Sequence, residues 1–231
     1  MKSSTFDTIT CLVGEFLATA LLLFLGCMGC TGQNNSLLQM ALNFGFAVML
    51  IIQCFGCVSG AHLNPAITLS AYIMDLISLR MSLGYLFAQL LGSYVGYALL
   101  MSLIPKSFLP VDGDNIGFCV TMPHSDFNFV RACTIEFIIT STLILFACSI
   151  WDPRNEKFCE TVSLRFCLAV VCMGLTAGNF TGASMNPARS LAPALWNNNF
   201  KYQGVYWIGP LSAAVVSSYV YKLVFWREVH E

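Results

Sequence analysis

Two short stretches of the chain carry nearly the same polar residues in the same order. Residues 59–68 read SGAHLNPAIT and residues 181–190 read TGASMNPARS, so Gly-Ala-x-x-Asn-Pro-Ala occurs twice. Proline at the first position of a helix is preorganised for helix formation, and asparagine directly before it is a good N-cap. Each stretch therefore predicts a short helix that begins at Asn64 or Asn186. The N-terminal end of such a helix carries partial positive charge.

Other ionisable residues stand within or beside apolar sequence. Glu15 and Glu136 lie inside apolar stretches, where a carboxylate is a candidate functional group such as a proton relay. Arg189 directly follows the second Asn-Pro-Ala and has no acidic partner nearby in sequence, so we expect loop carbonyls to hold it. His62 fits a pH-sensitive group, because histidine changes charge in the physiological range. We favour the alternative, a packed polar residue.

The composition predicts that these residues lie in a membrane. The chain of 231 residues is 57% hydrophobic and 10% charged, with a mean hydropathy of +0.71, whereas soluble domains carry about 25% charged residues. A helix spans the bilayer with about 20 apolar residues. The first stretch resembles a signal peptide in its position, but we interpret it as a transmembrane helix that is not cleaved off, because five more apolar stretches follow it. Six stretches qualify: 9–30, 37–58, 80–104, 129–151, 162–178 and 204–226.

The two polar stretches belong to a longer internal repeat. Asn186 follows Asn64 by 186 − 64 = 122 residues, and Glu136 follows Glu15 by 136 − 15 = 121. The chain is therefore a duplicated unit of three spans, and the odd number inverts the second copy in the membrane. Inverted repeats are typical of transporters and channels, with a site near the bilayer midplane. The expected domain is a single unit with repeats at 9–104 and 129–226.

Neither polar stretch is followed by enough apolar sequence to cross the membrane. We expect half-helices over 64–75 and 186–196, each reached through irregular backbone, Gly60–Leu63 and Gly182–Met185. Such backbone is tolerated at membrane depth only when it is buried in protein or lines an aqueous path. The fold class is thus all-α, with six transmembrane helices and two re-entrant half-helices whose positive ends meet at the centre.

The eleven cysteines do not predict a metal site. Cys27/Cys30 and Cys54/Cys57 have CxxC spacing, but both pairs lie in apolar spans without a histidine at zinc-ligand spacing. Buried cysteine is a good small hydrophobe. Only Cys119 lies clearly in a loop, so we expect no disulfide framework.

Several function classes are disfavoured by the rest of the sequence. There is no nucleophile–base pair and no phosphate-binding glycine loop, so we expect neither an enzyme nor a cofactor. No ring of acidic residues suggests an ion channel, and the net charge of −1 gives no sign of nucleic-acid binding.

The basic residues predict the orientation in the bilayer. With both termini in the cytoplasm, seven lie inside and three outside, as the positive-inside rule favours. Asn34 begins a glycosylation sequon on the expected outer side. The two groups are Lys2, Arg80, Arg154, Lys157, Arg165, Lys222 and Arg227 against Lys106, Arg131 and Lys201.

The chain resembles the aquaporin (major intrinsic protein) family over nearly its whole length. The resemblance implies a homotetramer in the lipid bilayer of the plasma membrane, with one pore in each subunit. It implies that Asn64 and Asn186 donate hydrogen bonds to the permeating molecule and that the carbonyls of the irregular segments accept them. It also implies that Glu15 and Glu136 brace these segments, which we favour over the relay. The motifs comprise Asn64, Pro65, Ala66, Asn186, Pro187 and Ala188.

The same resemblance places a selectivity filter at the narrowest point. Water-selective members have a histidine at the position of Gly174, so the constriction is expected to be wide and half-apolar. Ala183 stands where mercury-sensitive members have cysteine, so weak mercurial inhibition is expected unless Cys172 faces the pore. The four filter positions are Phe44, Gly174, Ala183 and Arg189.

The remaining sequence has the pattern of a water channel. Ser190, Ala194 and Tyr206-Trp207 belong to that pattern, and the combination with a small filter residue is similar to insect entomoglyceroporins. The resemblance implies passive permeation by water, glycerol and urea. A strictly water-selective channel is the alternative, and it requires Met173 or Leu175 to fill the gap at Gly174.

Overall fold

The computed structural model describes residues 5–32, 35–109 and 117–227, and its regular structure in these ranges is helical. The sequon residue Asn34 and Lys2 lie outside them. Within the described residues, six helices are long and apolar enough to cross a membrane. The helices are α1 Thr5–Met28, α2 Leu37–Ser59, α3 Pro65–Ile73, α4 Leu79–Leu103, α5 Phe129–Trp151, α6 Val162–Thr181, α7 Pro187–Trp196 and α8 Gln203–Val220. Short 3₁₀ segments occupy Lys106–Phe108 and Pro153–Thr161, and a π-helical turn occupies Tyr221–Phe225.

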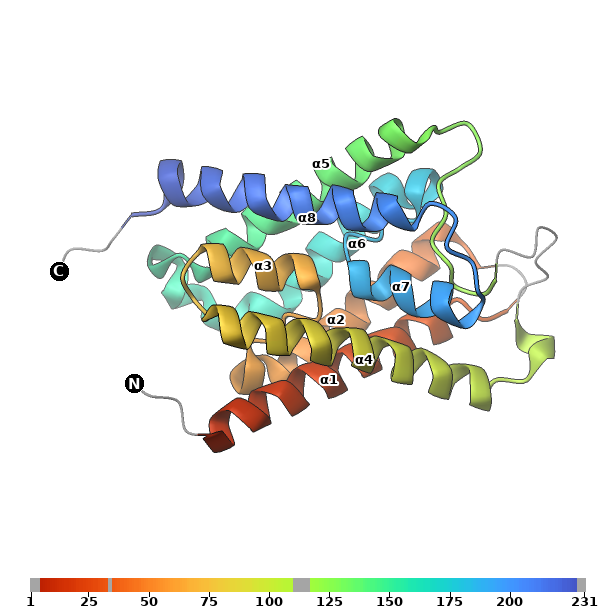
Figure 1. The fold of residues 1–231 in the computed structure, drawn as a ribbon, viewed down its shortest axis with the longest axis horizontal. Coiled ribbons are helices and arrows are strands. Elements are labelled where there is room, and N and C mark those ends of the chain that lie inside the picture. Colours follow the sequence, from red (N-terminus) through yellow and green to blue (C-terminus); the bar gives the residue numbers. More distant parts are fainter. Residues whose placement is uncertain (1–4, 33–34, 110–116, 228–231) are drawn as a thin grey trace.

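The expected fold class is confirmed. Helices α3 and α7 are short, lie in the middle of the molecule and approach each other from opposite ends (Figure 1). Helix α1 begins, and the π-helical turn after α8 ends, at one end of the molecule, which we name the terminal end; α1 ends at the opposite, far end (Figure 1). The first half-helix stops at Ile73, short of the expected residue 75, because Asp75 has the left-handed φ of 60°.

Small residues allow the long helices to approach closely. A Cβ added at Gly92 or Gly96 of α4 would overlap the carbonyl oxygens of Phe16 or Ala20 in α1. The corresponding pair in the second repeat is α5 and α8, where a Cβ at Gly209 would lie 3.1 Å from the carbonyl oxygen of Cys133. Small residues are common where transmembrane helices pack, because lipid supplies no hydrophobic force to drive them together.

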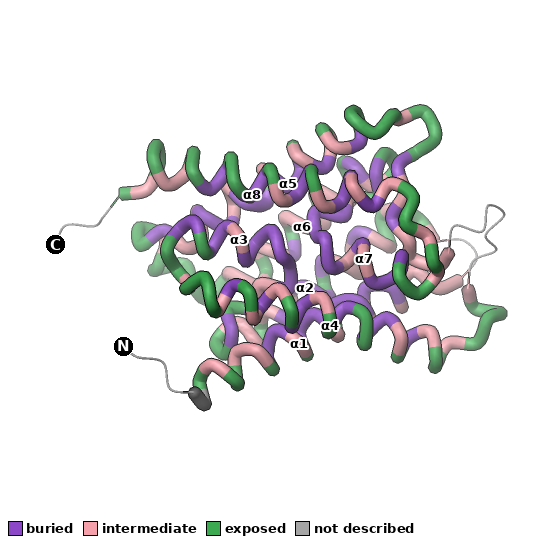
Figure 2. Tube along the Cα trace, viewed as in Figure 1, coloured by how far each residue is buried: buried purple, intermediate pink, exposed green. Residues whose placement is uncertain are grey.

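Burial follows the expected pattern for a bundle in lipid. The half-helices and the inward faces of the long helices are buried, whereas the outer faces are exposed (Figure 2). Large apolar side chains such as Phe87, Val130 and Leu168 lie on these outer faces. Helix α6 is the least enclosed, since only 6% of its most apolar window is buried.

The expectation about cysteines is wrong in one respect. Cys27, near the end of α1, forms a disulfide with Cys119 in the loop before α5, 92 residues later. The position of Cys27 in an apolar span predicts a small buried hydrophobe, and the residue is indeed fully buried. The fold brings the loop down to the end of that span, which local sequence does not indicate. Nine other cysteines in the described ranges are free.

Candidate functional site

The two half-helices meet at their N-terminal ends through a reciprocal pair of hydrogen bonds. Asn64 Nδ2 donates to the carbonyl oxygen of Met185, and Asn186 Nδ2 donates to that of Leu63, each over 2.8 Å. The Oδ1 atoms accept from the backbone of the asparagines' own helices, as N-caps do. An asparagine amide has two N–H groups. One is used in the cross-contact, and the second is available to the cavity that both residues line.

The backbone before each half-helix adopts an unusual conformation in both repeats. Residues with positive φ recur at matching positions, since Ala61 and Leu63 have φ of 47° and 59°, and Ala183 and Met185 have 46° and 53°. A left-handed conformation costs a residue with a Cβ about 1–2 kcal/mol. These segments are therefore held by their surroundings.

Glu15 holds the first of these segments. Its side chain is fully buried in α1 and accepts hydrogen bonds from the backbone N–H groups of His62 and Leu63, over 2.8 and 3.0 Å. It also accepts from Ser59 Oγ and Gln89 Nε2, both over 2.8 Å. Hydrogen bonds to a charged group contribute about 1.5–3 kcal/mol each, which is enough to offset the backbone cost.

Glu136 makes the equivalent contacts in the second repeat. It is fully buried and accepts from the backbone N–H groups of Ser184 and Met185, over 3.0 and 2.8 Å. Thr181 Oγ1 donates to it over 2.7 Å, in the place of the serine hydroxyl in the first repeat. No described side chain takes the place of Gln89, so Glu136 has three such donors where Glu15 has four.

Sequence reasoning did not reveal the contacts by which a pair of tyrosines secures the same segments. Tyr85 Oη donates to the carbonyl oxygen of Ser59, and Tyr206 Oη donates to that of Thr181, each over 2.7 Å. The two tyrosines are separated by 206 − 85 = 121 residues. Extending the repeat search to the third span of each copy would have found them.

A cavity of about 590 Å³ passes the meeting point of the half-helices. Residues from both ends of the molecule line it, from Trp151 near the terminal end to Phe118 at the far end. Its wall includes Asn64 and Asn186 and the four expected filter residues, Phe44, Gly174, Ala183 and Arg189. The two asparagines and the four filter residues therefore surround one space. The other expected site residues lie behind its wall and do not line it: Pro65, Ala66, Pro187, Ala188, Glu15 and Glu136.

Arg189 is held at the far end of this cavity by a loop rather than by an acid. Its Nη1 donates to the carbonyl oxygen of Cys119 over 2.8 Å, and its Nη2 lies 3.4 Å from the Cys119 sulfur. The guanidinium carbon lies 5.0 Å from the centre of the Phe44 ring, within the range of a cation–π interaction. Arg189 also lines the cavity.

Gly174 has a packing role that the sequence did not indicate. A Cβ at this position would lie 3.0 Å from the Cβ of Ala41 in α2, closer than ordinary van der Waals contact. The glycine therefore leaves the cavity without a side chain and also lets α6 approach α2. Met173 and Leu175, its neighbours, are not among the cavity-lining residues, and neither is Cys172.

At the terminal end, the cavity mouth contains His62 and Trp151. His62 Nδ1 lies 3.2 Å from Thr68 Oγ1, and the His62 ring is 5.2 Å from that of Tyr85 and 6.0 Å from that of Trp151. This environment is compatible with the packed polar residue that we favour.

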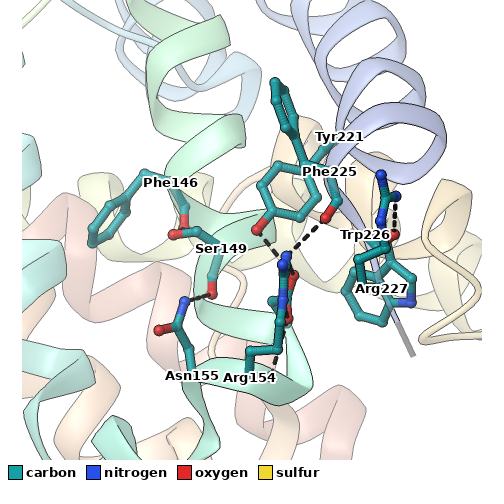
Figure 3. A network of polar contacts seen from close by, with 9 residues as sticks. Phe146, Ser149, Arg154, Asn155, Tyr221, Phe225, Trp226 and Arg227 are labelled. Atoms are coloured by element: carbon teal, nitrogen blue, oxygen red, sulfur yellow. Dashed lines mark hydrogen bonds and ion pairs between the residues drawn. The ribbon is translucent and has the colours of Figure 1, made fainter. Parts of the chain in front are cut away.

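A polar network next to Trp151 joins the α5–α6 connection to the end of the chain's last helix. Asp152 is 1% exposed and accepts from Arg154 Nε and Nη2 over 2.8 and 2.6 Å and from Tyr221 Oη over 3.2 Å. Arg154 also donates to the carbonyl oxygen of Phe225 over 2.7 Å (Figure 3). The hydrogen bonds from Arg154 lower the pKa of the Asp152 carboxyl.

Comparison with known proteins gives one family. The family model described as Major intrinsic protein matches residues 2–221. Aquaporin-4 of Mus musculus is 34% identical over 223 residues, which cover 93% of this chain and 67% of its own length. Aquaporin-2 of Bos taurus is 36% identical over 215 residues, covering 92% and 77%. The X-ray structure of the aquaglyceroporin from Plasmodium falciparum has a TM-score of 0.79 at 28% identity, covering 94% of this chain and 96% of that one.

The matches extend over both copies of the repeat, and the fold has the helices and half-helices expected of such a channel. On this evidence of sequence and fold, the chain belongs to the aquaporin (major intrinsic protein) family.

Proposed function

We propose that the protein is a passive channel for water and small neutral polar solutes such as glycerol and urea, and that it excludes protons and ions. The observation that carries the solute range is the wall of the cavity at the expected filter. Of the four filter residues, only Phe44 is aromatic, and Gly174 and Ala183 add little bulk. A wide opening that is apolar on one side and has the donors of Arg189 on the other suits a small polyol.

The alternative, a strictly water-selective channel, requires a neighbouring side chain to fill the gap at Gly174. Leu175 is 41% exposed, and Met173 packs against a buried cluster that includes Leu143 and Met185. Neither lines the cavity, which supports the open filter. The mouse and bovine relatives are named aquaporins and the Plasmodium falciparum structure an aquaglyceroporin, so the names alone favour neither solute range.

The proposed roles follow from the contacts at the centre. The second N–H of Asn64 and of Asn186 donates to the permeating molecule, while carbonyls of Gly60–Leu63 and Gly182–Met185 accept from it. The carbonyls of Leu63 and Met185 are shared with the opposite asparagine. The positive ends of both half-helices and Arg189 raise the barrier for protons and cations.

We also propose the setting of the channel. Arg80, Arg154 and Lys222 belong to the terminal end, which supports a cytoplasmic position for both termini. The little-buried face of α6 supports contact with neighbouring subunits, as in the homotetramer that the family resemblance implies. We further propose that the channel lies in the plasma membrane and that its solute range is similar to that of insect entomoglyceroporins.

Stopped-flow light scattering on proteoliposomes tests the solute range. Under a sorbitol gradient, fast shrinkage relative to protein-free liposomes is expected. Under a glycerol or urea gradient, rapid reswelling is expected to follow. Fast shrinkage without reswelling in either solute would replace the proposal by the water-selective alternative, and unchanged shrinkage would contradict a channel altogether.

A further inference from the structure

The loop residue that holds Arg189 is also a member of the disulfide. Cys119 supplies both the carbonyl oxygen that accepts from Arg189 Nη1 and the sulfur that lies 3.4 Å from Nη2. The same sulfur is bonded to Cys27 at the end of α1. Cys119 and its neighbour Phe118 line the cavity. The residue that contacts the filter arginine directly, Cys119, is thus covalently bonded to a transmembrane helix.

The loop around Cys119 needs this support. Cys119 has the left-handed φ of 60°, which costs a residue with a Cβ about 1–2 kcal/mol. Non-covalent contacts hold the residues on either side of it. Tyr97 Oη donates to the carbonyl oxygen of Phe118 over 2.5 Å, and Thr121 Oγ1 donates to Ser190 Oγ over 2.7 Å. At Cys119 itself, the disulfide supplies the tie.

We propose that the Cys27–Cys119 disulfide is a positioning element of the selectivity filter, because it fixes the carbonyl that keeps Arg189 against the cavity wall. This inference rests on the proposed function, since it assumes that solutes pass Arg189. A buried donor that loses its acceptor needs another one. Without a fixed Cys119 carbonyl, the guanidinium is expected to find water in the lumen and to narrow the opening next to Phe44. Glycerol, which is larger than water, is affected more strongly.

The test compares Cys27→Ala, Cys119→Ala and the double variant with the wild type in proteoliposomes. Cys27→Ala is the sharpest of these, because it breaks the bond but leaves Cys119 unchanged. Cys172→Ala, at an exposed free cysteine away from the cavity, is the matched control. The ratio of glycerol to water permeability is measured, since this ratio does not depend on how many channels are folded.

A several-fold fall in this ratio is expected in all three disulfide variants and no change in the control. If the disulfide only stabilises the fold, both permeabilities fall together and the ratio stays constant, which overturns the proposal. Alkylation of the unreduced wild type followed by mass spectrometry is a second check. In denatured protein, Cys27 and Cys119 are expected to resist alkylation until a reductant is added, and their alkylation without it also overturns the proposal.

The design separates this inference from the solute range on which it rests. A wild type that conducts water but no glycerol contradicts the proposed solute range. The positioning role is then judged on water permeability per channel, with the folded protein in each preparation quantified. A value in Cys27→Ala equal to that of the wild type overturns the positioning role, and a lower value supports it.

Discussion

Asn64 and Asn186 each donate a side-chain hydrogen bond to the carbonyl oxygen directly before the other, over 2.8 Å in both directions. Because each asparagine also caps its own half-helix, this single pair sets both helix starts and the distance between them. The reciprocity follows from the inverted repeat, since each copy presents the same donor and the same acceptor to the other. The meeting point is therefore a structural joint as well as part of the cavity wall.

Replacing either asparagine with alanine is expected to destabilise the protein more than the loss of an ordinary helix cap. Asn64→Ala and Asn186→Ala remove a cap, for about 0.5–2 kcal/mol, and a cross-contact, for about 1 kcal/mol. Asn128→Ala is the control, because Asn128 caps α5 through its side chain at an exposed site. The unfolding temperature of each purified variant is measured. Equal shifts in all three variants would contradict a structural role of the cross-contact beyond helix capping.

The two buried carboxylates are expected to differ in their contribution to stability. In Glu15→Gln, the new NH₂ group faces N–H or O–H donors, and an orphaned buried donor costs about 1–3 kcal/mol. Glu15 holds four donors and Glu136 three, so Glu15→Gln is expected to lower the unfolding temperature more than Glu136→Gln. Exposed Glu160→Gln is the control.

The same variants distinguish the brace from a proton relay. If the carboxylates only brace the irregular segments, both glutamine variants are expected to be less thermally stable than the wild type. The wild type is then expected to conduct no protons. Proton flux across wild-type proteoliposomes that disappears in Glu15→Gln at unchanged stability would favour the relay instead. A pH-sensitive dye inside the vesicles measures this flux.

The sequence predicted the central elements because their signals are local. Asparagine before proline marks a helix start through its backbone chemistry, and the structure begins α3 and α7 directly after Asn64 and Asn186. The six spans follow from apolar length alone. The roles proposed for the filter residues stay predictions, although the structure gathers these residues on one cavity wall.

The features that the sequence did not reveal depend on long-range packing. Cys27 reads as one more apolar residue of a span, and only the folded loop brings Cys119 to it. The tyrosine contacts to Ser59 and Thr181 link a third span to an irregular segment, which no local pattern marks. The contact of Gly174 with Ala41 likewise requires the packing of α6 on α2.

Adding bulk at Gly174 is expected to reduce glycerol permeation while sparing water. The contact with Ala41 complicates a direct Gly174→His change, because overpacking costs about 1–3 kcal/mol. The companion change Ala41→Gly makes room for the new Cβ, at a helix cost of about 1 kcal/mol. The double variant is therefore compared with Ala41→Gly alone in the glycerol and sorbitol assays. Equal losses of glycerol and water permeability would contradict the filter assignment.

The weak mercurial inhibition expected from Ala183 is revised, because the structure places another free cysteine, Cys30, on the cavity wall. Inhibition is expected to depend on Cys30 rather than on Cys172. Cys30 is free and lines the cavity at the far end, whereas Cys172 is exposed and does not line it. A mercurial bound to the Cys30 thiol obstructs the passage beside Arg189. Water permeability is measured with and without p-chloromercuribenzenesulfonate. Cys30→Ser is expected to resist the reagent and Cys172→Ser to remain sensitive; the opposite order would contradict the lining of the cavity.

Asp152 is expected to make stability depend on pH in the acidic range. The hydrogen bonds from Arg154 hold its pKa below the ordinary value of 3.8. A carboxyl whose pKa is lowered by folding stabilises the fold fully above the unfolded value and loses this contribution as the pH falls through the folded value. The stability difference between wild type and Asp152→Asn should therefore be largest near neutral pH and shrink below about pH 4. Exposed Asp126→Asn serves as the control. Thermal unfolding across this range measures the effect, and a difference that grows on acidification would contradict the ion pair as its source.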